Sequence, residues 1–480
     1  MDLPIDISTT EWPRPADLRA GAARGDRATT TVSEPSTRAA LEVDAATAAM
    51  LDRIARLTFD YFDRGMHPRT GLVPDSTKPG APATVAGSGH ALACYTVGAE
   101  RGYVSRAHAI DRTLTILRFF QHSQQSEGRL ATGHRGFYYH FLDMESGRRV
   151  GRCELSTIDS AILFAGVLAS VAYFRRDTAA EGEIRSLGDA LYRRADWAWA
   201  TNGGDGVSMG WTPERGFLRH RWMGYNEALF LYVLALGSPS HPIDARGYAA
   251  WTTTYRWKRL YDTEYLYGGP LFIHQLSHTF IDFRAIQDAY MRVKGIDYFE
   301  NSRRATVIHR EYAIRNPRGF AGYGENTWGI TASDGPGPAQ RTSHGVTRRF
   351  WAYRARGVPY GPDDGTLSPW AVVASLPFAP ELVIPALVHL ERKHPEITAA
   401  LGYKCSYNPT FAERLDQAPE WVSSGHYAID QGPVVLMIEN HRSELVWRLM
   451  KSCPYIVDGL RAAGFDGGWL AAPTSIREAT

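Results

Sequence analysis

Residues 151–174 read GRCELSTIDSAILFAGVLASVAYF, and this stretch decides how the rest of the chain is interpreted. Two carboxylates, Glu154 and Asp159, stand near its start, and about four helical turns without a charge follow. Ser156 or Thr157 can cap the helix, which places Glu154 in the loop before it and Asp159 in its first turn. A helix that is apolar on every side must be buried. The stretch therefore predicts a buried helix whose polar N-terminal end opens on a cavity.

The same alternation recurs along the chain as a polar or glycine-rich loop, a buried helix and a more amphipathic helix. The buried helices are predicted to begin near Gly87, Ser156, Tyr225, Thr279, Ser368 and Gln431. The amphipathic helices are predicted over residues 106–121, 180–201, 285–293, 381–392 and 443–450. Pro369 and Pro433 fit this pattern, because proline is favoured in the first turn of a helix. Six inner helices with about six outer ones predict an all-α fold, an (α/α)6 toroid, without a fixed sequence period.

Other segments are predicted not to be helical. Residues 137–143 and 207–218 have the pattern of short β-hairpins, which we place in the loops at the polar end of the toroid. Residues 321–344 form a long loop rich in glycine, proline and aromatic residues, and such loops are often functional. Residues 1–43 have little periodicity and are predicted to be a loosely ordered arm, and residues 44–480 a single folded domain.

Composition excludes several classes of function. Net charge is only +2, with no basic run, so neither nucleic acid nor a membrane surface is an expected partner. The four cysteines are far apart and lack the spacing of a zinc site or a redox pair. No apolar run is as long as a transmembrane helix, and the first residues do not resemble a signal peptide. We expect a cytoplasmic protein as the sequence is written, and a periplasmic or secreted one if the N-terminus is truncated.

Polar residues gather where the buried helices are predicted to begin. Glu227 is the best single candidate, since an apolar helix follows it and apolar walls favour the protonated form that a general acid needs. An acid at a helix N-terminus also has a purely structural explanation, namely the helix dipole, and this holds equally for Asp159. The residues in this set are His90, Glu154, Asp159, Asn226, Glu227, His274, His278, Asp282, Arg284, Asp334, Asp364 and Asp430.

Two carboxyl groups on facing elements are what cleavage of a glycosidic bond requires. One donates a proton to the leaving oxygen, and the other supports water or the sugar ring. High aromatic content, with 13 Trp and 24 Tyr, suits stacking on sugars but also suits a large core. His274 and His278 have the i,i+4 spacing of a metal site, yet no HExxH glutamate accompanies them, so sugar binding or structural hydrogen bonding is favoured. A serine nucleophile and a phosphate loop have no supporting motif.

Seven motifs occur in an order that resembles a known family. They are ELSTIDSA from Glu154, MGYNEA from Met223, LGSPSHP from Leu236, GPLF from Gly269, WGITASD from Trp328, DGTLSP from Asp364 and DQGP from Asp430. Together they resemble the glucoamylase-like domain, a group that includes glycoside hydrolase family 144 and the cyclisation domain of cyclic β-1,2-glucan synthases. The resemblance extends over about residues 45–455.

This resemblance implies an (α/α)6 barrel that hydrolyses β-1,2-glucan or a related β-glucan, typically with inversion. The expected partner is an oligo- or polysaccharide, and no cofactor and no metal are implied. The acidic residues of the family correspond here to Glu227, expected to be the proton donor, and to Glu154, with Asp159 beside them. Residues predicted to bind the substrate are Asp143, His90, Tyr225, His274, His278, Arg284, Trp328, Asp334 and Asp364.

Two alternatives use the same residues. A transglycosylase would cyclise or transfer glucan chains, because a sugar hydroxyl can take the place that water has in hydrolysis. A non-catalytic glucan-binding protein would keep the aromatic loops and not use the carboxyl groups. The sequence barely distinguishes hydrolysis from transfer, and the hydrolase is the leading hypothesis because of the paired glutamates and the aromatic loops.

Overall fold

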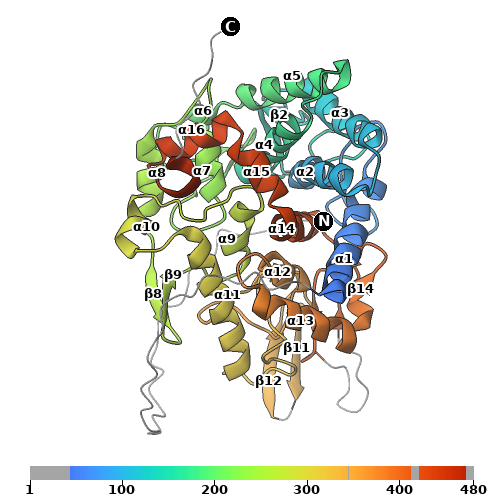
Figure 1. Ribbon diagram of the computed structural model, residues 1–480, viewed down its shortest axis with the longest axis vertical. Helices are drawn as coiled ribbons and strands as arrows, with labels where there is room; N and C mark the ends of the chain where they lie inside the picture. The colour runs from blue at the N-terminus through green and yellow to red at the C-terminus, as the bar shows by residue number, and fades with distance from the viewer. Residues whose placement is uncertain (1–43, 344, 412–420, 472–480) are drawn as a thin grey trace.

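The computed structural model describes residues 44–343, 345–411 and 421–471. These residues form a helix-rich structure with many short strands (Figure 1). The arm expected over residues 1–43 lies outside the described residues. Among the helices of these three ranges, none is both long and apolar enough to cross a lipid bilayer.

Six helical segments contact one another in a closed cycle. They are α2 (Val85–Arg101), α4 (Thr157–Tyr173), α7 (Leu229–Leu236), α9 (Phe272–Gln275) with the following 3-10 helix η2 (Leu276–Thr279), α12 (Pro369–Ala374) and α14 (Ala428–Ser443). α2 packs against α4, α4 against α7, α9 against α12, α12 against α14, and α14 against α2. Ser277 of η2 closes the cycle, because its hydroxyl donates to the Glu227 carbonyl oxygen (3.0 Å) and accepts from the Phe230 amide (3.2 Å).

The first two members of this cycle pack closely because glycines face each other. A Cβ atom on Gly166 of α4 would lie 2.0 Å from the carbonyl oxygen of Gly89 in α2, so only glycine allows this approach. Almost every residue of α4 is buried, as the uninterrupted apolar sequence predicts. The prediction of a buried helix at this position is therefore confirmed.

Amphipathic helices surround the cycle. α1 packs on α14, α3 and α5 pack on α2 and α4, α8 and α16 on α7, α11 on α9, and α13 on α12. Their bounds are α1 (Ala45–Gly65), α3 (Arg106–His122), α5 (Ala179–Arg194), α8 (Ala245–Thr252), α11 (Tyr298–Arg315), α13 (Pro380–Lys393) and α16 (Pro454–Ala462). The shorter helices are α6 (Trp197–Ala200), α10 (Ala289–Lys294) and α15 (Leu445–Lys451).

Short strands lead directly into the inner helices. A five-stranded sheet has the order β2-β3-β5-β6-β7, and β1 pairs with β4. β5 ends where α4 begins, and β1 ends where α2 begins, so these strands fix the N-terminal ends of both helices. The bounds are β1 (Ala83–Thr84), β2 (Gly133–His134), β3 (Phe137–Tyr139), β4 (Phe141–Leu142), β5 (Leu155–Ser156), β6 (Gly210–Thr212) and β7 (Gly216–Phe217).

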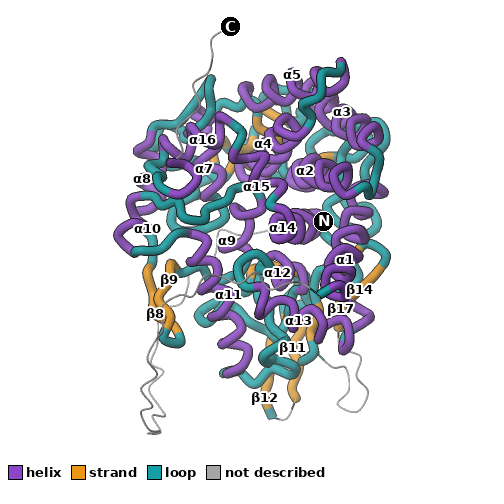
Figure 2. Tube along the Cα trace, viewed as in Figure 1, coloured by secondary structure: helices purple, strands orange, loops and turns teal. Residues whose placement is uncertain are grey.

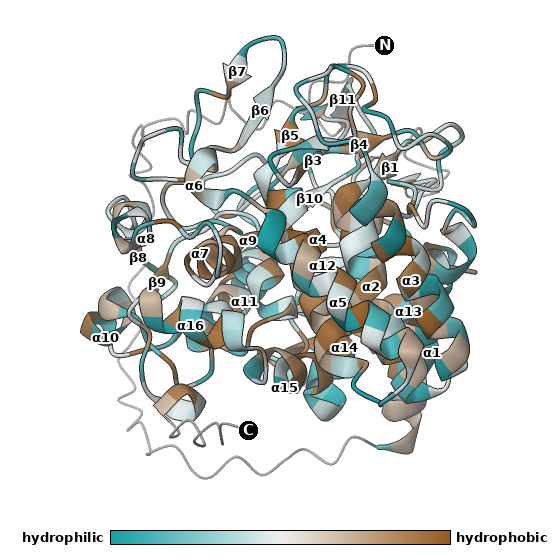
Figure 3. Ribbon diagram, turned by 90° about the horizontal axis from the view of Figure 1, so that it is seen from above, coloured by the Kyte–Doolittle hydropathy of each residue, from teal (hydrophilic) through white to brown (hydrophobic). Residues whose placement is uncertain are grey.

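The remaining strands form two-stranded ladders in the loops (Figure 2). They are β8 (Trp257–Leu260) with β9 (Thr263–Leu266), β10 (Ala332–Ser333) with β13 (Arg354–Ala355), β11 (Ala339–Ser343) with β12 (Val346–Phe350), β14 (Thr398–Ala399) with β15 (Gly402–Tyr403), and β16 (Tyr407–Asn408) with β17 (Trp421–Val422). Strands β1, β3 to β7, β10 and β11 gather on one side of the helices in Figure 3.

Several predicted boundaries are wrong for identifiable reasons. The helix expected to begin near Thr279 is absent, because η2 ends there. The helix expected over residues 285–293 is present as α10, but it begins only at Ala289, after Ala285 with its left-handed φ of 59°. The helix expected over residues 180–201 is split into α5 and α6, because Asp196 accepts from the Trp199 amide and starts a new helix. The loop expected over residues 321–344 contains β10 and β11.

Candidate active site

The N-terminal end of α4 carries the first pair of acids. Ser156 caps the helix, its hydroxyl accepting from the Asp159 amide (3.3 Å) and donating to the Asp159 carboxylate. Asp159 keeps only 7% of its surface exposed, whereas Glu154, in the preceding loop, is partly exposed. Both acids therefore lie at the entrance to α4, where the sequence predicts them.

A histidine lies between these two carboxylates. The Nδ1 atom of His140 is 2.9 Å from Oε1 of Glu154, and its Nε2 atom is 3.8 Å from Oδ1 of Asp159. The ring of Phe141 stacks on the imidazole, with 4.0 Å between centroids. Burial opposes a charge on His140, but Asp159 and Glu154 outweigh it and raise its pKa to about 9. His140 is therefore an imidazolium at neutral pH, bound between two acids.

The bound imidazolium fixes the protonation state of Glu154. Burial alone would raise the pKa of this carboxyl, but the hydrogen bond and the charge of His140 hold it below its ordinary value. Glu154 is therefore ionised at neutral pH, and one of its oxygens is already occupied by a hydrogen bond.

Glu227 has the opposite character. It lies one residue before the N-cap of α7, is partly exposed, and has no hydrogen bond or ion pair with another side chain in the described part of the chain. Burial raises the pKa of Glu227 to about 7, and the charge of Asp159 adds to this effect. Glu227, whose pKa is raised, thus lies within electrostatic reach of Asp159, which His140 joins to the ionised Glu154.

Further acids approach the same place from the N-terminal end of α14. Asp430, in the first turn of α14, is fully buried, and no group within the described ranges hydrogen-bonds to its carboxyl oxygens. Burial raises its pKa well above the ordinary value, the Cys405 thiol partly offsets this, and Asp75 and Asp334 reinforce it. We call Glu154, Asp159, Glu227, Asp75 and Asp430 the carboxylate cluster.

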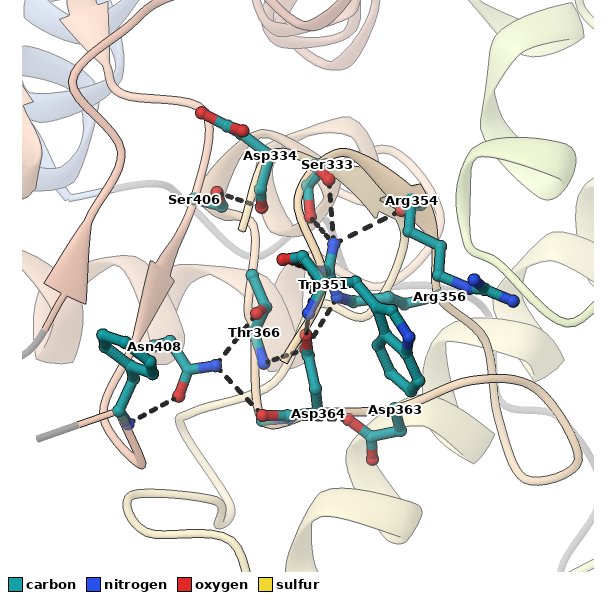
Figure 4. A network of polar contacts seen from close by, with 12 residues as sticks. Ser333, Asp334, Trp351, Arg354, Arg356, Asp363, Asp364, Thr366, Ser406 and Asn408 are labelled. Atoms are coloured by element: carbon teal, nitrogen blue, oxygen red, sulfur yellow. Dashed lines mark hydrogen bonds and ion pairs between the residues drawn. The ribbon is translucent and has the colours of Figure 1, made fainter. Parts of the chain in front are cut away.

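Asp334 lies beside this cluster and is partnered. Its Oδ2 atom accepts hydrogen bonds from Lys78 and from the Ser423 hydroxyl, each at 3.0 Å. Figure 4 shows Asp334 at one side of a polar network that continues through Ser333 to Arg356. Asp334, one of the nine residues predicted to bind substrate, therefore lies close to the carboxylate cluster.

Asp364 is held in that network instead of facing the cluster (Figure 4). Its two carboxylate oxygens accept from Nε and Nη2 of Arg356, at 2.7 and 2.9 Å, and both side chains are wholly buried. Arg356 also donates to the carbonyl oxygen of Ser333 at 2.8 Å. This arrangement is typical of a buried structural ion pair.

The predicted histidines occupy the core. The Nε2 atom of His274 is 3.0 Å from the Gly268 carbonyl oxygen, and that of His278 is 3.0 Å from the Ser302 hydroxyl. Burial lowers the pKa of His274 to about 4, and those of His278 and His90 to about 3, so all three are neutral. His90 stacks on Phe280, with centroids 6.1 Å apart.

The structure does not bring Arg284 to the cluster. Its guanidinium pairs with Asp282 (2.6 Å) and with Glu444 (2.7 Å), and Glu444 caps the C-terminal end of α14. Since Asp430 marks the N-terminal end of the same helix, Arg284 lies about a helix length, or roughly 20 Å, away.

The other three predictions have varied surroundings. Asp143 lies in the exposed turn after β4, where hydrogen bonds from Ser146 hold its pKa below the ordinary value. Trp328 is buried, with 2% of its surface exposed. Tyr225, two residues before Glu227, packs against His274 with centroids 5.1 Å apart. The last contact indicates that His274 supports a residue adjoining the cluster.

Two members of the site could not be recognised from the sequence. His140 stands in an aromatic strand segment, and Asp75 in a turn-rich loop, neither of which begins a buried helix. Their only signal is a polar residue inside an otherwise apolar or turn-forming segment. Within the described residues, no group of three or more His, Cys, Asp or Glu side chains has the arrangement of a metal site.

Comparison with known proteins identifies relatives of this chain. Residues 219–454 match the sequence model of a family described as "Putative glucoamylase". A solved structure from Bacteroides uniformis ATCC 8492 with the same description is 31% identical, with a TM-score of 0.78, covering 89% of this chain and 100% of that one.

Two relatives have more specific names. The endo-β-1,2-glucanase of Chitinophaga pinensis, solved with sophorotriose and glucose, is 27% identical with a TM-score of 0.74, covering 88% of this chain and 99% of that one. The exo β-1,2-glucooligosaccharide sophorohydrolase (non-reducing end) of Parabacteroides distasonis is 28% identical over 449 residues. That match covers 86% of this chain and 57% of the relative, so the chain spans little more than half of that protein's length.

Proposed function

This chain belongs to the glucoamylase-like family, and from that membership and the carboxylate cluster we propose that it is a glycoside hydrolase acting on β-1,2-linked glucan. The observation that carries the proposal is that Glu227, whose pKa burial raises to about 7, lies within electrostatic reach of Asp159, which His140 joins to the ionised Glu154. Two relatives named for β-1,2-linked glucans support the choice of substrate.

The proposed architecture is a single domain with the (α/α)6 toroid as its fold. The closed cycle from α2 to α14 supplies the inner helices, and α1, α3, α5, α11, α13 and α16 belong to the outer layer. In this architecture, N-terminal ends of inner helices meet at one end of the toroid. The carboxylate cluster occupies that end, since Asp159, Glu227 and Asp430 each lie at the start of an inner helix.

In the proposed mechanism, the protonated acid and the ionised acid have different roles. Glu227 donates its proton to the leaving glycosidic oxygen as the bond breaks. Glu154 stabilises the positive charge that develops on the sugar ring, because an ionised carboxylate in a partly buried site acts strongly on nearby charge, and Asp159 lies beside it. His140 is a positioning residue, which keeps Glu154 ionised and fixes its orientation.

The proposal is tested by incubating the purified protein with linear β-1,2-glucan, and with starch and a β-1,3-glucan as controls. Thin-layer chromatography and mass spectrometry should show β-1,2-linked oligosaccharides from the first substrate only. Larger or cyclic products at high acceptor concentration would assign the chain to transglycosylases instead. Saturable binding of the glucan without any cleavage would refute the hydrolase.

Replacing His140 with glutamine should lower kcat/KM by about 10-fold or more, because an amide keeps one hydrogen bond but removes the charge. Without that charge, the pKa values of Glu154 and Asp75 should both rise, because His140 lowers both of them. The acidic limb of the pH profile should then move to higher pH, which a merely structural change would not cause. His389→Gln, on the outer helix α13, is the matched control and should keep both the rate and the profile of the wild type. An unchanged acidic limb in His140→Gln would remove the role assigned to this residue.

A further inference from the structure

Asp75 lies where two inner helices begin. It belongs to the loop between α1 and β1, and its amide donates to the Pro82 carbonyl oxygen at 2.7 Å. Its own carbonyl oxygen accepts from the amide of Ala428, the first residue of α14, at 2.8 Å. Since Pro82 leads into β1 and α2, these two bonds hold the Asp75 backbone between the N-terminal ends of α2 and α14.

The side chain of Asp75 has no hydrogen-bonding partner, unlike three of the neighbouring acids. Glu154 accepts from His140, Asp159 from Ser156, and Asp334 from Lys78 and Ser423. No described residue makes a hydrogen bond or ion pair with the Asp75 carboxyl, which is partly exposed to solvent. Its oxygens are therefore available to a water molecule, whereas Glu154, Asp159 and Asp334 each already accept a hydrogen bond. Glu227 also lacks a partner, but it is assigned as the proton donor, and Asp430 is fully buried.

We infer that Asp75 is the general base of the reaction proposed above, the carboxylate that takes a proton from the attacking water. Glu154 is poorly suited to that role, because a carboxylate whose pKa is held low by an imidazolium is a weak base and has one oxygen occupied. Asp430 is unsuitable because it is fully buried, and burial raises its pKa well above the ordinary value. The inference rests on the proposed hydrolase function and names a further residue for it.

The charges around Asp75 suit this role. Asp159 on α4, His140 between β3 and β4, Lys78 in the same loop and Asp430 on α14 all act on it. Burial raises its pKa to about 6, with Asp159 adding to the rise and His140 and Lys78 opposing it. The surrounding tyrosines are Tyr61, Tyr353 and Tyr427. Asp75 is therefore mostly ionised above about pH 6, while Glu227 remains mostly protonated below about pH 7.

The resulting step is a single displacement. The water oxygen bonds to the anomeric carbon while the bond from that carbon to the glycosidic oxygen breaks. Asp75 accepts one proton of the water, and Glu227 gives its proton to the departing oxygen, so charge and atoms balance. Attack from the face opposite to the leaving group inverts the anomeric configuration, and a β-linked glucan should release an α-anomer first.

The decisive variant is Asp75→Asn, assayed on linear β-1,2-glucan beside the wild type. General-base catalysis contributes about 10²–10⁴-fold, so kcat should fall by that factor while the KM changes little. Asp111→Asn, an exposed aspartate on the outer helix α3, is the matched control and should keep wild-type activity. Near-wild-type kcat in folded Asp75→Asn would overturn the inference while leaving the hydrolase function in place.

Rescue by azide distinguishes a general base from a residue with a purely structural role. In Asp75→Ala, sodium azide can occupy the vacated position and attack without a base, so cleavage should rise at least about 10-fold and yield an α-glycosyl azide. A β-glycosyl azide, or no rescue in a folded variant, would contradict the assignment. Proton NMR of fresh wild-type digests should show the α-anomer first, and an initial β-anomer would contradict it too.

If both Asp75 variants fail to fold, Lys78→Met tests the same idea. Loss of this cation should raise the pKa of Asp75 and move the acidic limb of wild-type kcat/KM, near pH 6, to higher pH. An unmoved limb in the folded Lys78→Met protein would count against Asp75 as the base. If the wild type cleaves no β-1,2-glucan at all, the result refutes the proposed hydrolase function, on which the role of Asp75 rests.

Discussion

Replacement of Glu227 with glutamine is expected to lower kcat on β-1,2-glucan by about 10²–10⁴-fold, because the amide keeps the size of the side chain but has no acidic proton to donate. Burial, aided by Asp159, raises the pKa of Glu227 to about 7, so the carboxyl carries its proton up to neutral pH. In the wild type, kcat/KM should therefore decline as the pH rises through about 7. That decline should be absent from the residual activity of Glu227→Gln. Initial rates measured across the pH range give both quantities.

A substrate with a good leaving group separates proton donation from general damage to the site. A dinitrophenyl glycoside of a β-1,2-linked oligosaccharide needs no proton from the enzyme, so Glu227→Gln should cleave it nearly as fast as the wild type does. Glu183→Gln, which only breaks a surface ion pair with Arg118, is the matched control. Equal losses on both substrates would show that Glu227 is not the proton donor.

The parts of the fold that could be predicted are those decided by local sequence. The uninterrupted apolar run in α4 requires burial wherever the helix is placed, and Ser156 marks its start. The helix α11, Tyr298–Arg315, was missed because its charged residues hide a face that packs on α9 and β9. The helix expected to begin at Thr279 is instead a helical segment over residues 272–279 that ends there, and the left-handed conformation of Ala285 does not allow a helix to continue past that residue.

The site residues also differ in whether a local sequence signal marks them. Glu227 and Glu154 could be found because each precedes an apolar helix, which is a signal contained in a few neighbouring residues. His140 and Asp75 could not, since their roles arise from contacts with Asp159 and Ala428, far away in the chain. Arg284 is predicted at the N-terminal end of the buried helices, but it pairs with Glu444 at the C-terminal end of α14. The sequence does not show this pairing.

Replacement of Asp364 with asparagine is expected to destabilise the protein by about 3–5 kcal/mol, because it leaves the Arg356 guanidinium buried without a counter-charge. Asp364 also fixes the surrounding loops, accepting from the amides of Trp351 (3.0 Å) and Thr366 (3.2 Å). Urea denaturation should show a lower midpoint with an unchanged slope. Since neither side chain reaches the carboxylate cluster, the folded fraction should keep nearly wild-type kcat/KM.

A double-mutant cycle distinguishes the ion pair from simple packing. If the stability loss in Asp364→Asn comes from an unpaired charge, then adding Arg356→Met should recover much of it, because the second change removes the charge that lacks a partner. Asp262→Asn, at an exposed position paired only with Arg259, should change stability by less than about 0.5 kcal/mol. Additive losses in the double variant would mean that the pair contributes through shape alone. A large loss of kcat/KM in folded Asp364→Asn would instead restore this residue to the substrate site, because a purely structural pair affects stability and not the chemical step.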